Sequence, residues 1–132
     1  MKTTRLLPMV LLFSMSVLLD STDLLAQCTG ADEYGYLMFF ADGSGDGNYQ
    51  VNQSCSWSFE SRIGGICKIG FSDFHTETDY DFVRIYDGPD ANAPLLAELS
   101  GNIDPGFYTT TQPFAFIEWN SDGIETRPGF SG

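Results

Sequence analysis

The sequence predicts an all-β fold, a two-sheet antiparallel β-sandwich. After residue 27 the chain shows short runs in which apolar and polar residues alternate, the period of a half-buried strand. Clusters of Gly, Asp, Asn and Pro separate these runs, and no stretch of useful length has the helical period of apolar residues. About seven short strands in roughly 105 residues are typical of a sandwich of two sheets.

Each predicted strand is bounded by turn residues. The strands are expected at Tyr34–Phe39, Cys55–Glu60, Ile66–Phe71, Phe82–Tyr86, Leu95–Leu99, Tyr108–Thr111 and Phe114–Trp119. The turns between them include "DGSGDGN", "YDGPDANAP", "GNIDPG" and "NSDG". The first of these is not a helix–loop–helix calcium loop, because no helices flank it and no Glu closes it.

Residues 1–27 have the pattern of a secretory signal peptide. Two basic residues precede an apolar run from Leu6 to about Leu19, and a small-residue exit leads to Cys28. The run is too short and too interrupted for a membrane span. A lipid anchor on Cys28 is the weaker interpretation, because Gln27 stands where such sites usually have Gly or Ala. The domain is therefore expected to span 28–132.

The acidic composition limits the partners. The chain has 6 Lys and Arg against 18 Asp and Glu, a net charge of −12, and residues 28–132 keep the same net charge. Such a surface repels nucleic acid and anionic lipid, and it favours cations or basic proteins. An aromatic content of 14% separates the chain from acidic disordered tails, which cannot build a core.

Three cysteines remain after the predicted leader, and an exported protein is expected to pair two of them. Cys67 lies in the alternating run "ICKIGF", where it resembles a small buried apolar residue. We therefore predict a disulfide between Cys28 and Cys55, which would stabilise the domain by about 3 kcal/mol.

A carboxylate is predicted on the buried face of one strand. Val83 and Ile85 share a face, and the alternation places Asp81 on the same face. Burial of an unpaired carboxylate costs at least on the order of several kcal/mol. Arg84 lies on the opposite face and bases are few, so a metal ion is the natural counter-charge. Acidic residues in loops are, however, usually solvated turn formers.

Four segments in this order resemble the CUB domain, an extracellular jelly-roll-like β-sandwich: "DGSGDGNYQVNQSCSW", "IGFSDFHTE", "YDFVRIYDG" and "IEWNSDG…GF". The resemblance runs from Cys28 to the end of the chain. The family often has a second disulfide, but here its positions hold Thr78 or Asp79, and Ser100. The family usually continues beyond "GFSG" into a further edge strand, so either the last strand is short or the sequence is a fragment of a longer protein.

The resemblance implies one calcium ion at an end of the sandwich. Its ligands would be Glu77, Asp81 and Asp122, with Tyr49 hydrogen-bonded to a ligand carboxylate. Calcium takes about 6–8 oxygen ligands, and these hard donors favour it over zinc or iron. Backbone carbonyls near Gly123 and Ile124 would complete the shell.

Two functions follow as hypotheses. The first is an extracellular calcium-binding module that accepts a Lys or Arg of a partner protein. The second is an accessory domain of a secreted enzyme such as a protease, or a glycan-binding module. Candidate aromatic residues for glycan binding are Tyr34, Tyr36, Phe82, Tyr86 and Tyr108.

Catalysis by the domain itself is not expected, because His75 is the only histidine and no serine-nucleophile motif occurs. Asn52-Gln53-Ser54 is a glycosylation sequon.

Overall fold

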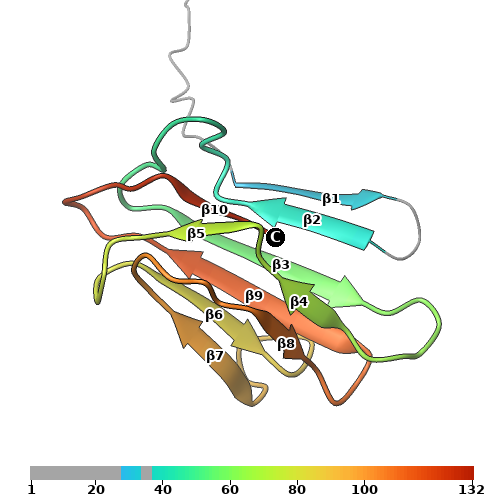
Figure 1. Cartoon of the computed structure of the whole chain (residues 1–132). Coiled ribbons are helices and arrows are strands. Elements are labelled where there is room, and N and C mark those ends of the chain that lie inside the picture. Colours follow the sequence, from blue (N-terminus) through green and yellow to red (C-terminus); the bar gives the residue numbers. More distant parts are fainter. Residues whose placement is uncertain (1–27, 34–36) are drawn as a thin grey trace, which may run out of the picture.

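A computed structural model describes residues 28–33 and 37–132, and these residues form strands joined by turns and loops, without a helix (Figure 1). The predicted leader, 1–27, lies outside the described residues. No helix in the described part of the chain is long and apolar enough to cross a membrane. The strands are β1 (Thr29–Glu33), β2 (Leu37–Ala41), β3 (Ser54–Glu60), β4 (Lys68–Gly70), β5 (Asp73–His75), β6 (Phe82–Tyr86), β7 (Leu95–Leu99), β8 (Phe107–Thr109), β9 (Phe114–Asn120) and β10 (Gly129–Ser131).

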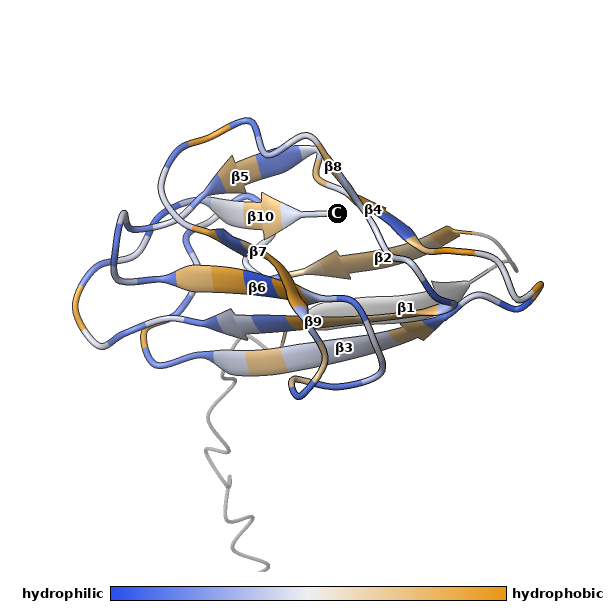
Figure 2. Ribbon diagram, turned by 90° about the horizontal axis from the view of Figure 1, so that it is seen from below, coloured by the Kyte–Doolittle hydropathy of each residue, from blue (hydrophilic) through white to orange (hydrophobic). Residues whose placement is uncertain are grey.

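The strands form two antiparallel layers (Figures 1 and 2), which confirms the predicted all-β sandwich. One sheet has the order β1-β2-β10-β5, and the other has the order β3-β9-β6-β7. The β4–β8 pair places Lys68 opposite Thr109, and the isolated bridge of His75 with Asn102 continues the same register. The segment that leads into β8 therefore pairs with β5 on the side that faces away from β10.

Most predicted strands are confirmed, with ends shifted by one or two residues at β3, β4, β8 and β9. In the first predicted strand, Leu37–Phe39 belongs to β2, whereas residues 34–36 lie outside the described residues. β1, β5 and β10 were not predicted. Their segments, "TGADE", "DFH" and "GFS", are too short or too polar to show alternation. They are strands because of their pairing: β1 pairs with β2, and β10 pairs with β2 and β5.

Aromatic rings fill the space between the layers. The ring of Phe130, on β10, has five aromatic neighbours with centroid distances of 5.1 to 6.3 Å: Phe40, Trp57, Phe71, Phe74 and Trp119. Val83 and Ile85 are fully buried beside this cluster, as the alternation of β6 predicts. Asp81 is also fully buried, so the expected carboxylate on the buried face is present.

The disulfide between Cys28 and Cys55 is confirmed, and it joins the start of the described chain to β3. Cys67 is free, as predicted, but it is half-buried instead of lying within the core. Its Sγ donates to the carbonyl of Pro113 at 3.3 Å. Burial raises the pKa of this thiol, so Cys67 stays protonated at neutral pH and is a weak nucleophile.

A second buried carboxylate fixes β10 to β2. Asp42 is 2% exposed, and its two oxygens accept the backbone N–H groups of Ser44, at 2.8 Å, and of Phe130. Gly129 makes this approach possible, because a Cβ at that position would lie 2.0 Å from Asp42 Oδ2. The φ of Gly129 is +88°, a left-handed conformation that favours glycine.

We predict that Gly129→Ala destabilises the domain more than Gly45→Ala. Gly45 has φ +60° with open space around it, so alanine there costs only the left-handed strain, about 1–2 kcal/mol. At Gly129 the new Cβ also displaces a buried, hydrogen-bonded carboxylate, which adds about 1–3 kcal/mol. Urea unfolding of both variants measures the difference, and equal midpoints would contradict the role of Asp42.

Candidate metal centre

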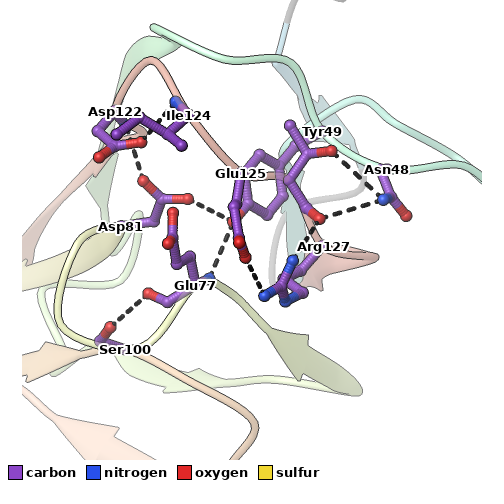
Figure 3. A network of polar contacts seen from close by, with 10 residues as sticks. Asn48, Tyr49, Glu77, Asp81, Ser100, Asp122, Ile124, Glu125 and Arg127 are labelled. Carbon is purple, nitrogen blue, oxygen red and sulfur yellow. Dashed lines mark hydrogen bonds and ion pairs between the residues drawn. The ribbon is translucent and has the colours of Figure 1, made fainter.

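Three carboxylates from two segments, the loop between β5 and β6 and the turn after β9, meet at one end of the sandwich (Figure 3). Glu77 follows β5, Asp81 directly precedes β6, and Asp122 follows β9. Carboxylate oxygens of the three residues lie within 4.8 Å of one another. The structure therefore brings together all three residues that the resemblance implied as ligands, although they are up to 45 positions apart in the chain.

Asp81 is oriented by donors on both of its carboxylate oxygens. The hydroxyl of Tyr49 donates to Oδ2, and the backbone N–H of Asp122 donates to Oδ1 at 2.6 Å. These contacts offset the cost of burying the charge. A carboxylate has about four lone-pair positions, so two donors leave room for a cation.

Tyr49 contacts both acids of the loop between β5 and β6. It is 1% exposed, and its ring packs edge-on against Trp119, with centroids 4.9 Å apart and an interplanar angle of 78°. Its hydroxyl donates to Asp81 and accepts the backbone N–H of Glu77 at 2.9 Å. Burial, together with the hydrogen bond to Asp81, raises the pKa of Tyr49 well above its usual value. The hydroxyl therefore remains a donor at all ordinary pH values.

The loop from Thr76 to Asp81 is held by hydrogen bonds between its own residues and by one to Gly101. The buried Thr76 hydroxyl donates to the carbonyl of Asp81 at 3.1 Å and accepts the N–H of Gly101 at 2.9 Å. The backbone N–H of Asp81 donates to the carbonyl of Glu77 at 3.2 Å. The two acids of this loop therefore keep a defined spacing.

Hydrogen bonds occupy the place of the family's second disulfide. The hydroxyl of Ser100 accepts the N–H of Asp79 at 2.8 Å and donates to the carbonyl of Glu77 at 2.9 Å. Asp79 has φ +67°, a left-handed conformation that this anchoring holds. Ser100 thus joins the acidic loop to the end of β7 without a covalent bond.

Glu77, unlike Asp81, has no hydrogen bond to offset the burial of its carboxylate oxygen. Its Oε2 is buried and has no hydrogen-bond partner. Desolvation raises the pKa of Glu77, and the negative charges of Asp122, Glu125 and Asp81 raise it further, while Arg127 lowers it. An unpartnered oxygen that faces two other carboxylates is unfavourable unless a proton or a cation lies between them.

Asp122 closes its own turn. Its Oδ1 accepts the backbone N–H of Ile124 at 2.9 Å, which is the geometry of an Asx turn. Gly123 and Ile124 are exposed beside the three carboxylates, and Ile124 is 78% exposed. The participation of their carbonyls as ligands stays a prediction.

Sequence analysis missed the basic residue at this end. Arg127 forms an ion pair with Glu125, and both side chains are more than a third exposed. The hydrogen bond that Arg127 donates to Glu125 is the main reason that the pKa of Arg127 is raised. Figure 3 shows the guanidinium directed at Glu125, so Arg127 offsets the charge of that residue first.

The donor set fits a hard divalent cation. The three side chains supply only carboxylate oxygens, and the one histidine, His75, lies within β5 and pairs through its backbone with Gly129 and Asn102. Calcium prefers such oxygen ligands, whereas zinc prefers nitrogen and sulfur. The buried, unpartnered oxygen of Glu77 supports the same conclusion.

The CUB domain family model matches residues 33–131, which includes every residue of this centre. The chain belongs to the CUB domain family. Its relatives include mouse Tolloid-like protein 2, 35% identical over 62% of this chain and 8% of that protein. The zinc metalloproteinase nas-39 of Caenorhabditis elegans is 32% identical over 81% of this chain and 12% of that protein. Pig cubilin is 29% identical over 68% of the chain and 3% of that protein.

Solved structures show the same fold. The full extracellular region of zebrafish Gpr126/Adgrg6 aligns with a TM-score of 0.60 and 25% identity, over 70% of this chain and 12% of that chain. The CUB1-EGF-CUB2 domain of human MASP-1/3 aligns with a TM-score of 0.56 and 17% identity, over 79% of this chain and 38% of that chain. The chain thus spans a small part of the larger CUB-containing proteins that it matches.

We predict that Tyr49→Phe destabilises the calcium-free domain by about 1–3 kcal/mol, because it leaves a buried oxygen of Asp81 and the N–H of Glu77 without their partner. Tyr86→Phe is the matched control. The hydroxyl of Tyr86 donates to Glu118 at 2.9 Å on the half-exposed outer face, where water can replace it. Chemical unfolding of both variants in EDTA is the measurement. If Tyr86→Phe lowers the free energy of unfolding as much as Tyr49→Phe does, the hydrogen bonds around Asp81 stabilise the domain no more than a hydrogen bond on the outer face.

Proposed function

We propose that this chain is a secreted calcium-binding interaction module of the CUB type, in which Glu77, Asp81 and Asp122 are the metal ligands. The observation that carries the proposal is the buried Oε2 of Glu77, which has no partner and belongs to a group of three converging carboxylates. Calcium would supply the positive charge that these oxygens lack. It would join the loop after β5 to the turn after β9.

The residues of the chain prepare this geometry before any ion binds. Tyr49 and the N–H of Asp122 hold the Asp81 carboxylate, so its orientation requires no further ordering. Glu77 is the least restrained ligand, because only its backbone is held, by Tyr49 and Ser100. Binding would therefore order the Glu77 side chain most, and pre-organisation of the other groups lowers the entropic cost.

A basic protein is the partner that the charge distribution favours. The chain has a net charge of −12, and three carboxylates gather at this end, where Arg127 pairs with Glu125 instead of with them. A Lys or Arg of a partner, placed beside a calcium-held carboxylate, would form a charge-assisted hydrogen bond. The same net charge disfavours nucleic acid. We do not propose catalysis by this domain, because the sequence has one histidine and no serine-nucleophile motif.

Export is part of the proposal. The disulfide between Cys28 and Cys55 is typical of oxidising compartments outside the cytosol. One aligned structure is the extracellular region of a zebrafish protein. The pattern of residues 1–27 as a leader agrees with these observations.

An accessory role in a larger secreted enzyme is the second candidate function. The observation in its favour is that a relative named as a zinc metalloproteinase is matched over only 12% of its length.

A glycan-binding role has less support. Tyr34 and Tyr36 lie outside the described residues, and the ring of Tyr86 packs at 6.0 Å against Phe116 as a cross-strand pair. Phe82 is half-buried, with the guanidinium of Arg84 5.0 Å from its ring centre, and Tyr108 is half-buried against the core.

We predict that calcium raises the thermal unfolding temperature of the wild-type domain and that Glu77→Gln removes most of this increase. Glutamine keeps the size of the side chain but removes its charge. The Glu77 carboxylate oxygen Oε2 makes no hydrogen bond within the fold, so the variant is expected to fold normally. The control is Asp104→Asn, which neutralises an exposed acid outside the acidic cluster and should keep the full calcium effect. Differential scanning calorimetry in calcium and in EDTA measures all three proteins.

Without calcium, Glu77→Gln is expected to stabilise the domain instead of destabilising it relative to wild type. The pKa of Glu77 is raised in the folded state, so its ionisation is less favourable there than in the unfolded chain. The resulting loss of stability is absent below the unfolded pKa, grows as pH rises toward the folded pKa, and is complete above it. In EDTA at neutral pH, Glu77→Gln should therefore be more stable than wild type. Equal calcium responses in wild type and Glu77→Gln would contradict the ligand assignment.

A further inference from the structure

Asn52 combines a modification sequence with an exposed position next to the candidate metal centre. Asn52-Gln53-Ser54 is the single Asn-x-Ser/Thr sequence in the chain. Asn52 is exposed and has φ 57°, the left-handed turn conformation that Asn adopts more readily than most residues. N-linked glycans occur on such surface turns of exported proteins.

The segment that carries Asn52 runs beside the segment that follows Asp122. The backbone N–H of Asn52 donates to the carbonyl of Asp122 at 2.7 Å, and that of Tyr49 donates to the carbonyl of Arg127 at 3.1 Å. The Asn52 side chain borders Gly123, with Oδ1 and Nδ2 3.3 and 3.5 Å from the position of a Cβ there. Asn52 therefore lies on the rim of the metal centre.

The other two residues of the sequon anchor the turn. The N–H of Gln53 donates to the hydroxyl of Ser121 at 2.8 Å, and its side-chain Nε2 donates to the carbonyl of Asp42 at 3.1 Å. The hydroxyl of Ser54, on the exposed side of β3, donates to Asn120 Oδ1 at 3.1 Å. The buried Gln53 thus fixes the backbone of the turn, while Asn52 beside it stays exposed.

We propose that Asn52 is an N-glycosylation site and that its glycan screens the segment 120–125 from macromolecules while leaving the metal centre open to ions. In the transfer, Asn52 Nδ2 loses a proton and bonds to the anomeric carbon of an oligosaccharide whose lipid pyrophosphate departs. The proposal rests on the export and the calcium site of the proposed function. A glycan here would make partners approach the acidic end from the side of the 76–81 loop.

The first test is glycan attachment. The full chain is expressed in insect cells behind the host's secretion leader, as wild type, Asn52→Gln, Ser54→Ala and Ser54→Thr. Intact mass is measured before and after an endoglycosidase that leaves one sugar on the asparagine. Wild type and Ser54→Thr should carry an added mass that the endoglycosidase reduces, and the other two variants should carry none. Unmodified wild type and Ser54→Thr in the medium would overturn the proposal.

The second test is access, measured by cleavage with a Glu-specific protease in saturating calcium. Cleavage after the exposed Glu125 should be severalfold slower in the glycosylated chain than in the trimmed chain. Cleavage after Glu60, at the far end of β3 from Asn52, is the internal control and should be the same in both. Equal rates at Glu125 would overturn the screening role.

Calorimetric titration separates this proposal from the proposed function. Calcium affinity should be the same in the glycosylated and trimmed chains, and a severalfold loss in the glycosylated chain would overturn the claim that ions pass freely. If neither chain binds calcium, the proposed function fails, whereas the masses and cleavage rates still decide whether Asn52 carries a screening glycan.

Discussion

The acidic end of this CUB domain depends on the buried carboxylate of Asp81. Its position is dictated by β6, where the alternation that buries Val83 also turns Asp81 inward. A charge there is tolerated because Tyr49 and the backbone of Asp122 both donate to it. These two contacts connect the segment before β3, the start of β6 and the turn after β9. One hydrogen-bonded carboxylate thus determines where three distant parts of the chain meet.

Other buried carboxylates in the described domain show what distinguishes this group. Asp42 accepts backbone donors on both oxygens, and Asp87 accepts the backbone and the hydroxyl of Thr111 at 2.8 and 2.7 Å. Protein donors satisfy these two residues, and each joins neighbouring segments of the fold. Glu77 has a buried oxygen without a donor and two further carboxylates beside it. That difference is the physical basis for proposing a cation here and a purely structural role for Asp42 and Asp87.

The sequence predicted the parts of the fold in which local pattern and tertiary environment agree. The alternation identified β6 and β9 as strands and, in β6, the buried face; the free Cys67 was predicted from the alternating run that contains it. Three short strands could not be predicted, because a segment such as β10 is a strand only through its pairing with β5 and β2. The same limit applied to the centre. The three acids of the centre could be predicted from the resemblance to the family. The supporting contacts of Thr76 and Ser100 could not, because their hydroxyls bond to backbone groups far away in the chain and no sequence pattern marks them.

The most direct test of the central claim is an anomalous difference map from a crystal of this domain grown with calcium or a lanthanide in its place. We expect one strong peak at the acidic end, about 2.3–2.6 Å from oxygens of Glu77, Asp81 and Asp122. A well-ordered crystal with no peak there, or with those three carboxylates turned away from a peak elsewhere, would contradict the account.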